Sequence, residues 1–305
     1  MVALRTRGKQ QRQSQQSARH PGLAASTSAL TQQRQRARHP THQDPVEDRR
    51  LSDFYSAGVR TIGVDLAAEP TGTAIASIEW LPEQATVSGL VIGADDGQVI
   101  DAVLGADKAG IDSPLRWPMS FVEFGTAHRD GHVSIPADVD SRRWRRTLAY
   151  RATDEAVRQL TSLIPLTVAA DRIAHPAMRC AGLLAQLARH GYAVDRGGTG
   201  LLVEVYPAAS LKRWNLPHRG YKRAPNVAKL GQLVDAILAI APWLRLSEFD
   251  SVCRRSDHAI DAIVAALTAR AAHLGRVTIP PAGQRDLAAI EGWIAVPTSE
   301  LPGII

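Results

Sequence analysis

The pattern of apolar and polar residues changes near residue 59, where three short apolar segments follow one another. The first, VRTIGVDLA (59–67), is a continuous apolar run, the second, GTAIASIEW (72–80), alternates small and apolar residues, and the third is ATVSGLVIG (85–93). Pro70 and Pro82 lie in the links between them. Short apolar segments joined by proline-containing links are typical of strands and turns. The pattern therefore predicts three antiparallel strands in a meander.

Helical spacing begins after this meander. The segment DDGQVIDAVLGA (95–106) predicts a helix capped by Asp95, and KAGIDSP (108–114) predicts a short strand. Later segments predict a helix, a buried strand and two amphipathic helices, in the order 175–192, 200–207, 226–240 and 256–274. This order of elements predicts an α/β fold with a mixed sheet flanked by helices on both faces.

One segment interrupts this pattern. Residues from about 115 to 165 are rich in Trp and Arg and have no sustained periodicity, which predicts a helical or irregular insertion.

Composition divides the chain in two. Residues 1–50 hold ten Lys or Arg and three Asp or Glu, so this Gln- and Arg-rich stretch carries a net charge of +7 and the rest of the chain about −1, which together give +6. With little to bury, residues 1–55 are expected to be a disordered basic tail, and residues 56–305 to form the folded domain. The tail would bind nucleic acid through its phosphates or be a solvated extension.

Several classes of protein are disfavoured. No stretch reaches 18 apolar residues, so we expect no membrane span, and the start lacks the apolar region of a secretory signal. The two cysteines, Cys180 and Cys253, are far apart, which is typical of a cytoplasmic protein. Neither has a neighbouring base, and there is no GxSxG motif, so nucleophilic catalysis has no support.

Two carboxylates end predicted strands, Asp65 after the first and Asp112 after the fourth. If these strands are parallel neighbours, both side chains reach the same edge of the sheet. Either residue alone would be an ordinary turn residue.

Further candidate residues lie late in the chain. The segment SDHAIDAIVAAL carries Asp257, His258 and Asp261, and positions 258 and 261 share one face of the predicted helix capped by Ser256. Asp257 is equally well explained as a charge at a helix start. Glu204 interrupts the apolar strand LLVEVYP and needs a partner or an exposed face.

Clustered carboxylates repel one another and need cations in return. Oxygen ligands favour Mg²⁺ or Mn²⁺, and two such ions can activate water for phosphodiester hydrolysis. The sequence thus predicts a divalent metal site, with Asp65 as a bridging ligand.

The same residues carry a resemblance. The motifs GVDLAA…TAIA, IDSP, YRATD, EVYPAASLKRW, YK and SDHAIDAIVAALTAR resemble domain-of-unknown-function family 429, a set of predicted ribonuclease-H-like nucleases, from about residue 60 to near residue 297. The resemblance implies a ribonuclease-H-like fold and a metal-dependent nuclease acting on DNA or RNA. It implies metal ligation by Asp65, Asp112 and Asp261.

The resemblance also implies supporting roles. Glu204 would be a further ligand and His258 a proton-transfer residue. Arg151 would contact substrate or form a structural pair with Asp154. Lys212 and Lys222, with Arg213 and Tyr221 beside them, would steer a phosphate backbone or form a solvated basic loop.

Two alternatives remain open. Sugar kinases and actin-like ATPases also begin with a strand-end Asp and a hairpin, and VDRGGTG (194–200) superficially resembles one of their phosphate loops, although its place before a strand favours a simple turn. A catalytically silent binding protein on the same fold is the other alternative, which the nearly neutral charge of the folded part favours.

Overall fold

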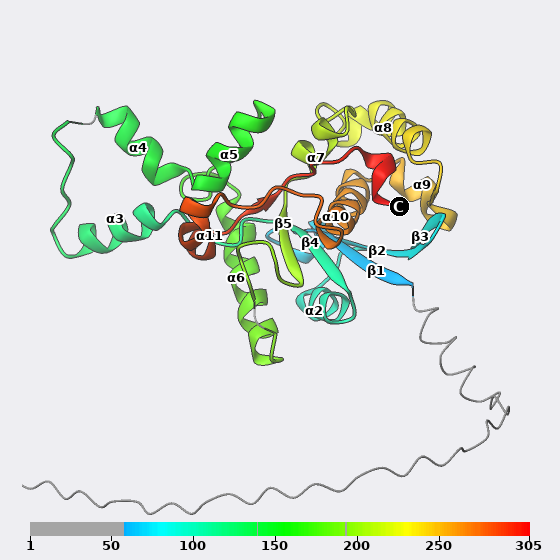
Figure 1. Ribbon diagram of the computed structural model, residues 1–305, viewed down its shortest axis with the longest axis horizontal. Coiled ribbons are helices and arrows are strands. Elements are labelled where there is room, and N and C mark those ends of the chain that lie inside the picture. The colour runs from blue at the N-terminus through cyan, green and yellow to red at the C-terminus, as the bar shows by residue number, and fades with distance from the viewer. Residues whose placement is uncertain (1–57, 139, 193) are drawn as a thin grey trace, which may run out of the picture. The chain divides into compact units, whose positions relative to one another are not determined.

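The computed structural model describes residues 58–138, 140–192 and 194–305 (Figure 1). The predicted basic tail, residues 1–55, lies outside the described residues. Within the described part, no helix is both long and apolar enough to cross a membrane.

The described residues form one mixed sheet of seven strands in the order β6-β3-β2-β1-β4-β5-β7. The strands are β1 (Val59–Asp65), β2 (Ala74–Leu81), β3 (Gln84–Ile92), β4 (Lys108–Asp112), β5 (Leu202–Val205), β6 (Leu244–Arg245) and β7 (Ile294–Ala295). β1, β2 and β3 pair antiparallel, whereas β4 is parallel to β1 and β5 is parallel to β4. The predicted meander and mixed sheet are therefore confirmed.

Helices cover both faces of this sheet. The helices of the described residues are α2 (Asp96–Leu104), α3 (Met119–Arg129), α4 (Ser141–Ala149), α5 (Ala152–Thr161), α6 (Ala174–Arg189), α7 (Pro207–Arg213), α8 (Val227–Ile240), α9 (Asp250–Cys253), α10 (Asp257–His273) and α11 (Arg285–Glu291). Figure 1 shows α10 on one side of β1 and β4 and α2 on the other.

Each face has its own core. Side chains of α8 and α10 pack with β2 in one apolar cluster, and side chains of α2 and α6 pack with β1 and β4 in another. The sheet is thus the middle of three layers, which buries its central strands on both faces.

The segment expected to be a helical or irregular insertion contains three helices. α3 and α4 contact each other through Phe124 and Trp144, whose rings pack edge to face with their centroids 5.8 Å apart. α5 instead packs its buried Val157 against Ala209 of α7 and Ile294 of β7. The part of the segment that is separate from the sheet core therefore ends before α5.

Candidate metal centre

Two carboxylates face each other at the carboxyl ends of β1 and β4. The parallel register pairs Asp65 with Asp112, as the sequence predicts. Both are the last residues of their strands. Because the two strands are neighbours, their carboxylates reach the same edge of the sheet.

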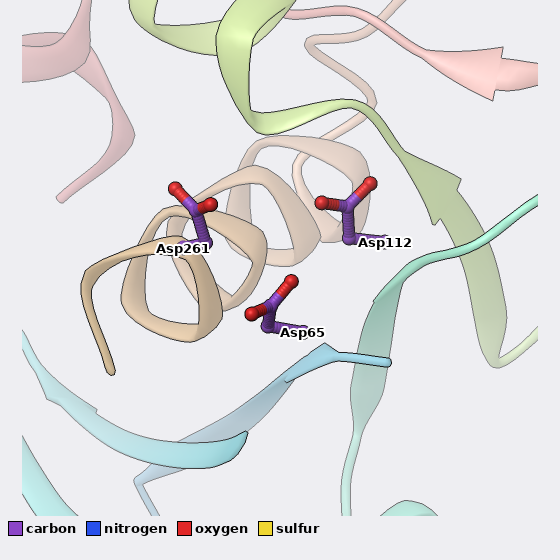
Figure 2. Close-up of side chains that lie close together, drawn as sticks. All are labelled: Asp65, Asp112 and Asp261. Atoms are coloured by element: carbon purple, nitrogen blue, oxygen red, sulfur yellow. The ribbon is translucent and has the colours of Figure 1, made fainter. Parts of the chain in front are cut away.

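The third carboxylate comes from α10. Ser256 caps this helix by accepting a hydrogen bond from the amide of Ala259 at 3.3 Å, and Asp261 follows in the second turn. Asp261 is only 1% exposed. One carboxylate oxygen from each of Asp65, Asp112 and Asp261 lies within 4.8 Å of the others, and Figure 2 shows the three side chains converging. We call these three residues the carboxylate cluster.

The cluster is electrostatically costly without a cation. Burial raises the pKa of Asp112 well above its ordinary value, and the negative charges of Asp65 and Asp261 raise it further. Burial likewise raises the pKa of Asp261, again with a contribution from Asp65. In both cases the positive charge of Lys222 acts in the opposite direction. A site that raises its own carboxyl pKa values this way favours a bound positive charge.

Lys222 supplies that charge in this structure. Its Nζ lies 2.5 Å from Oδ2 of Asp261, while the hydroxyl of the buried Tyr221 donates to Oδ1 of the same carboxylate at 2.7 Å. The backbone amide of Arg223 donates to Oδ2 of Asp257 at 2.9 Å. Asp257 thus holds the loop that carries Lys222 and lies outside the carboxylate cluster.

His258 contacts the cluster from its outer side. Its Nδ1 lies 2.6 Å from Oδ2 of Asp65, and its side chain is 45% exposed. The hydrogen bond to Asp65 raises the pKa of His258 above its ordinary value. His258 and Asp261 come from neighbouring positions of α10. The partly solvated imidazole of His258 lies beside Asp65.

Comparison with protein families matches residues 63–285 to the family described as "Protein of unknown function (DUF429)". The chain belongs to the DUF429 family. The matched region includes the whole carboxylate cluster, Lys222 and His258. Comparison with curated proteins found no match, and comparison with solved structures found none either.

Glu204 of this DUF429 chain lies in a separate buried ion pair. Arg151 donates to both of its carboxylate oxygens, at 2.8 Å and 2.7 Å, and also to Asp154 at 2.9 Å. The amide of Leu115 donates to Glu204 Oε2 at 3.0 Å. Of the two roles considered for Arg151, this geometry favours the structural pair, because Arg151 is 2% exposed and its guanidinium is occupied by carboxylates.

The predicted basic residues separate in space. Lys222 reaches the carboxylate cluster, whereas Lys212 lies in the last turn of α7 and, within the described part of the chain, forms no ion pair. Arg213 donates to the carbonyl oxygen of Pro297 at 3.2 Å. Lys222 is therefore the basic residue of this group that contacts the centre.

Arg179 orders the chain beside Asp65, a role that the sequence patterns did not indicate. From α6 its guanidinium donates to the carbonyl oxygen of Ala67 at 3.0 Å, to the hydroxyl of Thr73 at 2.6 Å and to Asp96 at 2.7 Å. These bonds fix the loop that follows β1. The signal available was an arginine in the middle of a helix of mostly small and apolar residues, which is too general to interpret alone.

Proposed function

We propose that this protein is a metal-dependent phosphodiesterase that cleaves nucleic acid, on a ribonuclease-H-like fold. The observation that carries the proposal is the convergence of three carboxylates from β1, β4 and α10, with oxygens within 4.8 Å of one another. An antiparallel meander followed by parallel strands, with acids at the ends of β1 and β4, agrees with the resemblance described above.

The donor set fits a hard divalent cation. Asp65, Asp112 and Asp261 offer only oxygen ligands, which is the preference of Mg²⁺ and Mn²⁺. The ion pair of Lys222 with Asp261 indicates that the carboxylate cluster attracts positive charge. When bound, such ions activate water and stabilise the departing oxygen in phosphodiester hydrolysis.

The residues of the chain have distinct tasks in this proposal. Asp65, Asp112 and Asp261 would hold the divalent ion or ions, with Asp65 as the proposed shared ligand. His258 is oriented by Asp65 through Nδ1 and is open to solvent, so it can hold or release a proton beside the scissile phosphate. Arg179 keeps the loop after Asp65 in place.

The substrate is proposed to be an anionic polymer because of the charge beside the centre. The stretch KRWNLPHRGYKR, residues 212–223, contains five Lys or Arg and no Asp or Glu. It ends in the loop that carries Lys222. Lys222 of this stretch lies at the carboxylate cluster. Once a cation occupies the cluster, the ammonium of Lys222 would be available to attract phosphates.

One observation disfavours the kinase or ATPase alternative. In the glycine-rich turn, the amides of Gly197, Thr199 and Gly200 donate to the carboxylate of Asp195, at 2.8, 2.8 and 3.0 Å. A phosphate-binding loop presents such amides to its ligand. In this turn the amides already donate to the carboxylate of Asp195, so they are not presented to a ligand.

The experiment is a cleavage assay with the full chain on single-stranded DNA, duplex DNA, branched DNA and RNA, with Mn²⁺, with Mg²⁺ and with EDTA. We expect metal-dependent cleavage of at least one substrate, lost in Asp65→Asn and Asp261→Asn. Asp101→Asn, an exposed change on α2, is the matched control and should retain activity.

Two outcomes would overturn the proposal. ATP hydrolysis without cleavage of any nucleic acid would favour the kinase-like alternative. A folded protein without either activity would favour the silent binding protein.

A further inference from the structure

A cavity of about 390 Å³ lies between the segment that follows β4, the first turn of α3, α6 and the loop before β5. Its walls include Arg116, Trp117, Leu184, Arg196 and Ile290, and none of the carboxylate cluster. Its volume is within the range of sites that hold small organic ligands. This cavity has no role in the function proposed above.

Two arginines line this cavity, and neither has a carboxylate partner among the described residues. Within the described part of the chain, neither Arg116 nor Arg196 lies within 4.0 Å of an acidic oxygen. The Nε of Arg196 is also buried and has no hydrogen-bond acceptor among the described residues. Arg151 and Arg179, by contrast, each contact carboxylates.

The positive charges of the Arg116 and Arg196 guanidinium groups repel each other. Burial lowers the pKa of Arg196, and the positive charge of Arg116 lowers it further. Like charges that share a desolvated cavity cost free energy, which an anion between them would offset. Arginine binds phosphate oxygens through two parallel N–H donors, so a pair of arginines matches one phosphate group.

The other lining residues indicate which chemical group is attached to the anion. Trp117, Leu184 and Ile290 are aromatic or aliphatic, and the one carboxylate of the lining, that of Glu123, belongs to an exposed residue. We propose that this cavity binds a phosphate monoester that carries a planar aromatic group, as a nucleotide does. The phosphate lies between Arg116 and Arg196, and the planar group packs against Trp117.

The test is equilibrium binding of adenosine monophosphate to the full chain in EDTA, with inorganic phosphate and adenosine as separate probes. The wild-type protein should bind the nucleotide more tightly than either fragment. Arg196→Met should weaken nucleotide binding at least about tenfold. Arg189→Met removes the same charge from an exposed position on α6 and should have no effect.

Two further variants separate the proposal from its rivals. Trp117→Leu should weaken binding of the nucleotide and leave binding of inorganic phosphate unchanged. Asp65→Asn should bind the nucleotide as the wild type does, because the metal centre is not involved.

Stability gives a second readout. Arg196→Met should keep or raise the Tm, because it removes a half-buried charge that has no carboxylate partner among the described residues, whereas loss of a structural arginine would lower it. The proposal is overturned if the wild type binds neither nucleotide nor phosphate at millimolar concentration. Undiminished binding by Arg196→Met, or loss of binding in Asp65→Asn alone, would also overturn it.

Discussion

Gly63 of β1 and Gly110 of β4 are register partners, and both lie against the backbone of α10. A methyl group on Gly63 would lie 1.9 Å from the carbonyl oxygen of Ala262, and one on Gly110 would lie 2.6 Å from that of Ala265. The helix therefore approaches the sheet as closely as backbone atoms allow. Only glycine at both positions permits this contact.

This contact positions the metal centre. Gly63 and Gly110 are two residues before Asp65 and Asp112, so within each strand the glycine and the carboxylate share one face of the sheet. Asp261 is on the helix that rests on those glycines. The same close approach that packs α10 therefore brings its carboxylate to the two strand ends.

We expect Gly63→Ala to lower the free energy of unfolding by about 3 kcal/mol, because the new methyl group overlaps a helix backbone that has little room to move. Urea denaturation of the full chain measures this. Gly231→Ala is the control: it lies within α8 with no atom within 4 Å of the new methyl group, and should stabilise by about 0.5–1 kcal/mol. Equal effects of the two changes would contradict the close-contact account.

Arg151→Met tests the assignment of Arg151 to a structural pair. The change leaves Asp154 and Glu204 buried without their partner, so we expect a loss of about 3–5 kcal/mol in the free energy of unfolding. Arg158→Met removes a partly exposed arginine of α5, the helix that Arg151 precedes, and should cost less than about 1 kcal/mol. A stable Arg151→Met protein with weakened substrate binding would instead favour the substrate role.

Lys222→Met tests the competition between the ammonium and a metal ion for Asp261. Without Lys222, the carboxylate cluster loses its positive neighbour, so the metal-free protein should have a lower Tm. Affinity for Mn²⁺ should rise several-fold, and not more, because the Lys222 side chain is 53% exposed and its charge is screened. Lys212→Met, with the same loss of charge on α7, should change neither quantity.

His258 should make stability depend on pH in the metal-free protein. Its hydrogen bond with Asp65 raises its pKa above 6.5, so folding favours the protonated form. The resulting stabilisation is fully present below the unfolded-state pKa and is lost as pH rises through the folded-state pKa. The wild type should thus exceed His258→Gln in stability by more at about pH 5.5 than at about pH 8.5.

Urea denaturation in EDTA at several pH values measures this difference. His190→Gln, an exposed change after α6, should show no such trend. A difference between wild type and His258→Gln that does not change with pH would contradict the Asp65–His258 interaction.

The sequence predicted the central fold because its strongest signals are local. The meander, β4, β5 and the long helices have clear periodicity, and Asp95 caps α2 with the expected hydrogen bond from Gln98, at 2.9 Å. β6 and β7 have two residues each, which is too short for any pattern. Their pairing is decided by neighbours distant in the sequence.

The candidate site was predictable in part. Local patterns were enough to place Asp65 and Asp112 at the ends of strands and Asp261 on a helix, because each pattern lies within a single segment. The ion pair between Lys222 and Asp261 could not be predicted, because it depends on how a loop of irregular sequence folds. One signal was present and was not used: GVD and GID repeat the same glycine-to-aspartate spacing at the ends of two strands.

The central claim is that Asp65, Asp112 and Asp261 together bind a divalent cation. The most direct measurement is titration calorimetry of Mn²⁺ into the metal-free full chain, its Asp65→Asn and Asp261→Asn variants, and the Asp101→Asn control. We predict saturable binding by the wild type and the control, weakened at least about tenfold in both cluster variants. A folded wild type that binds no Mn²⁺, or cluster variants that bind it as tightly as the control, would contradict the account.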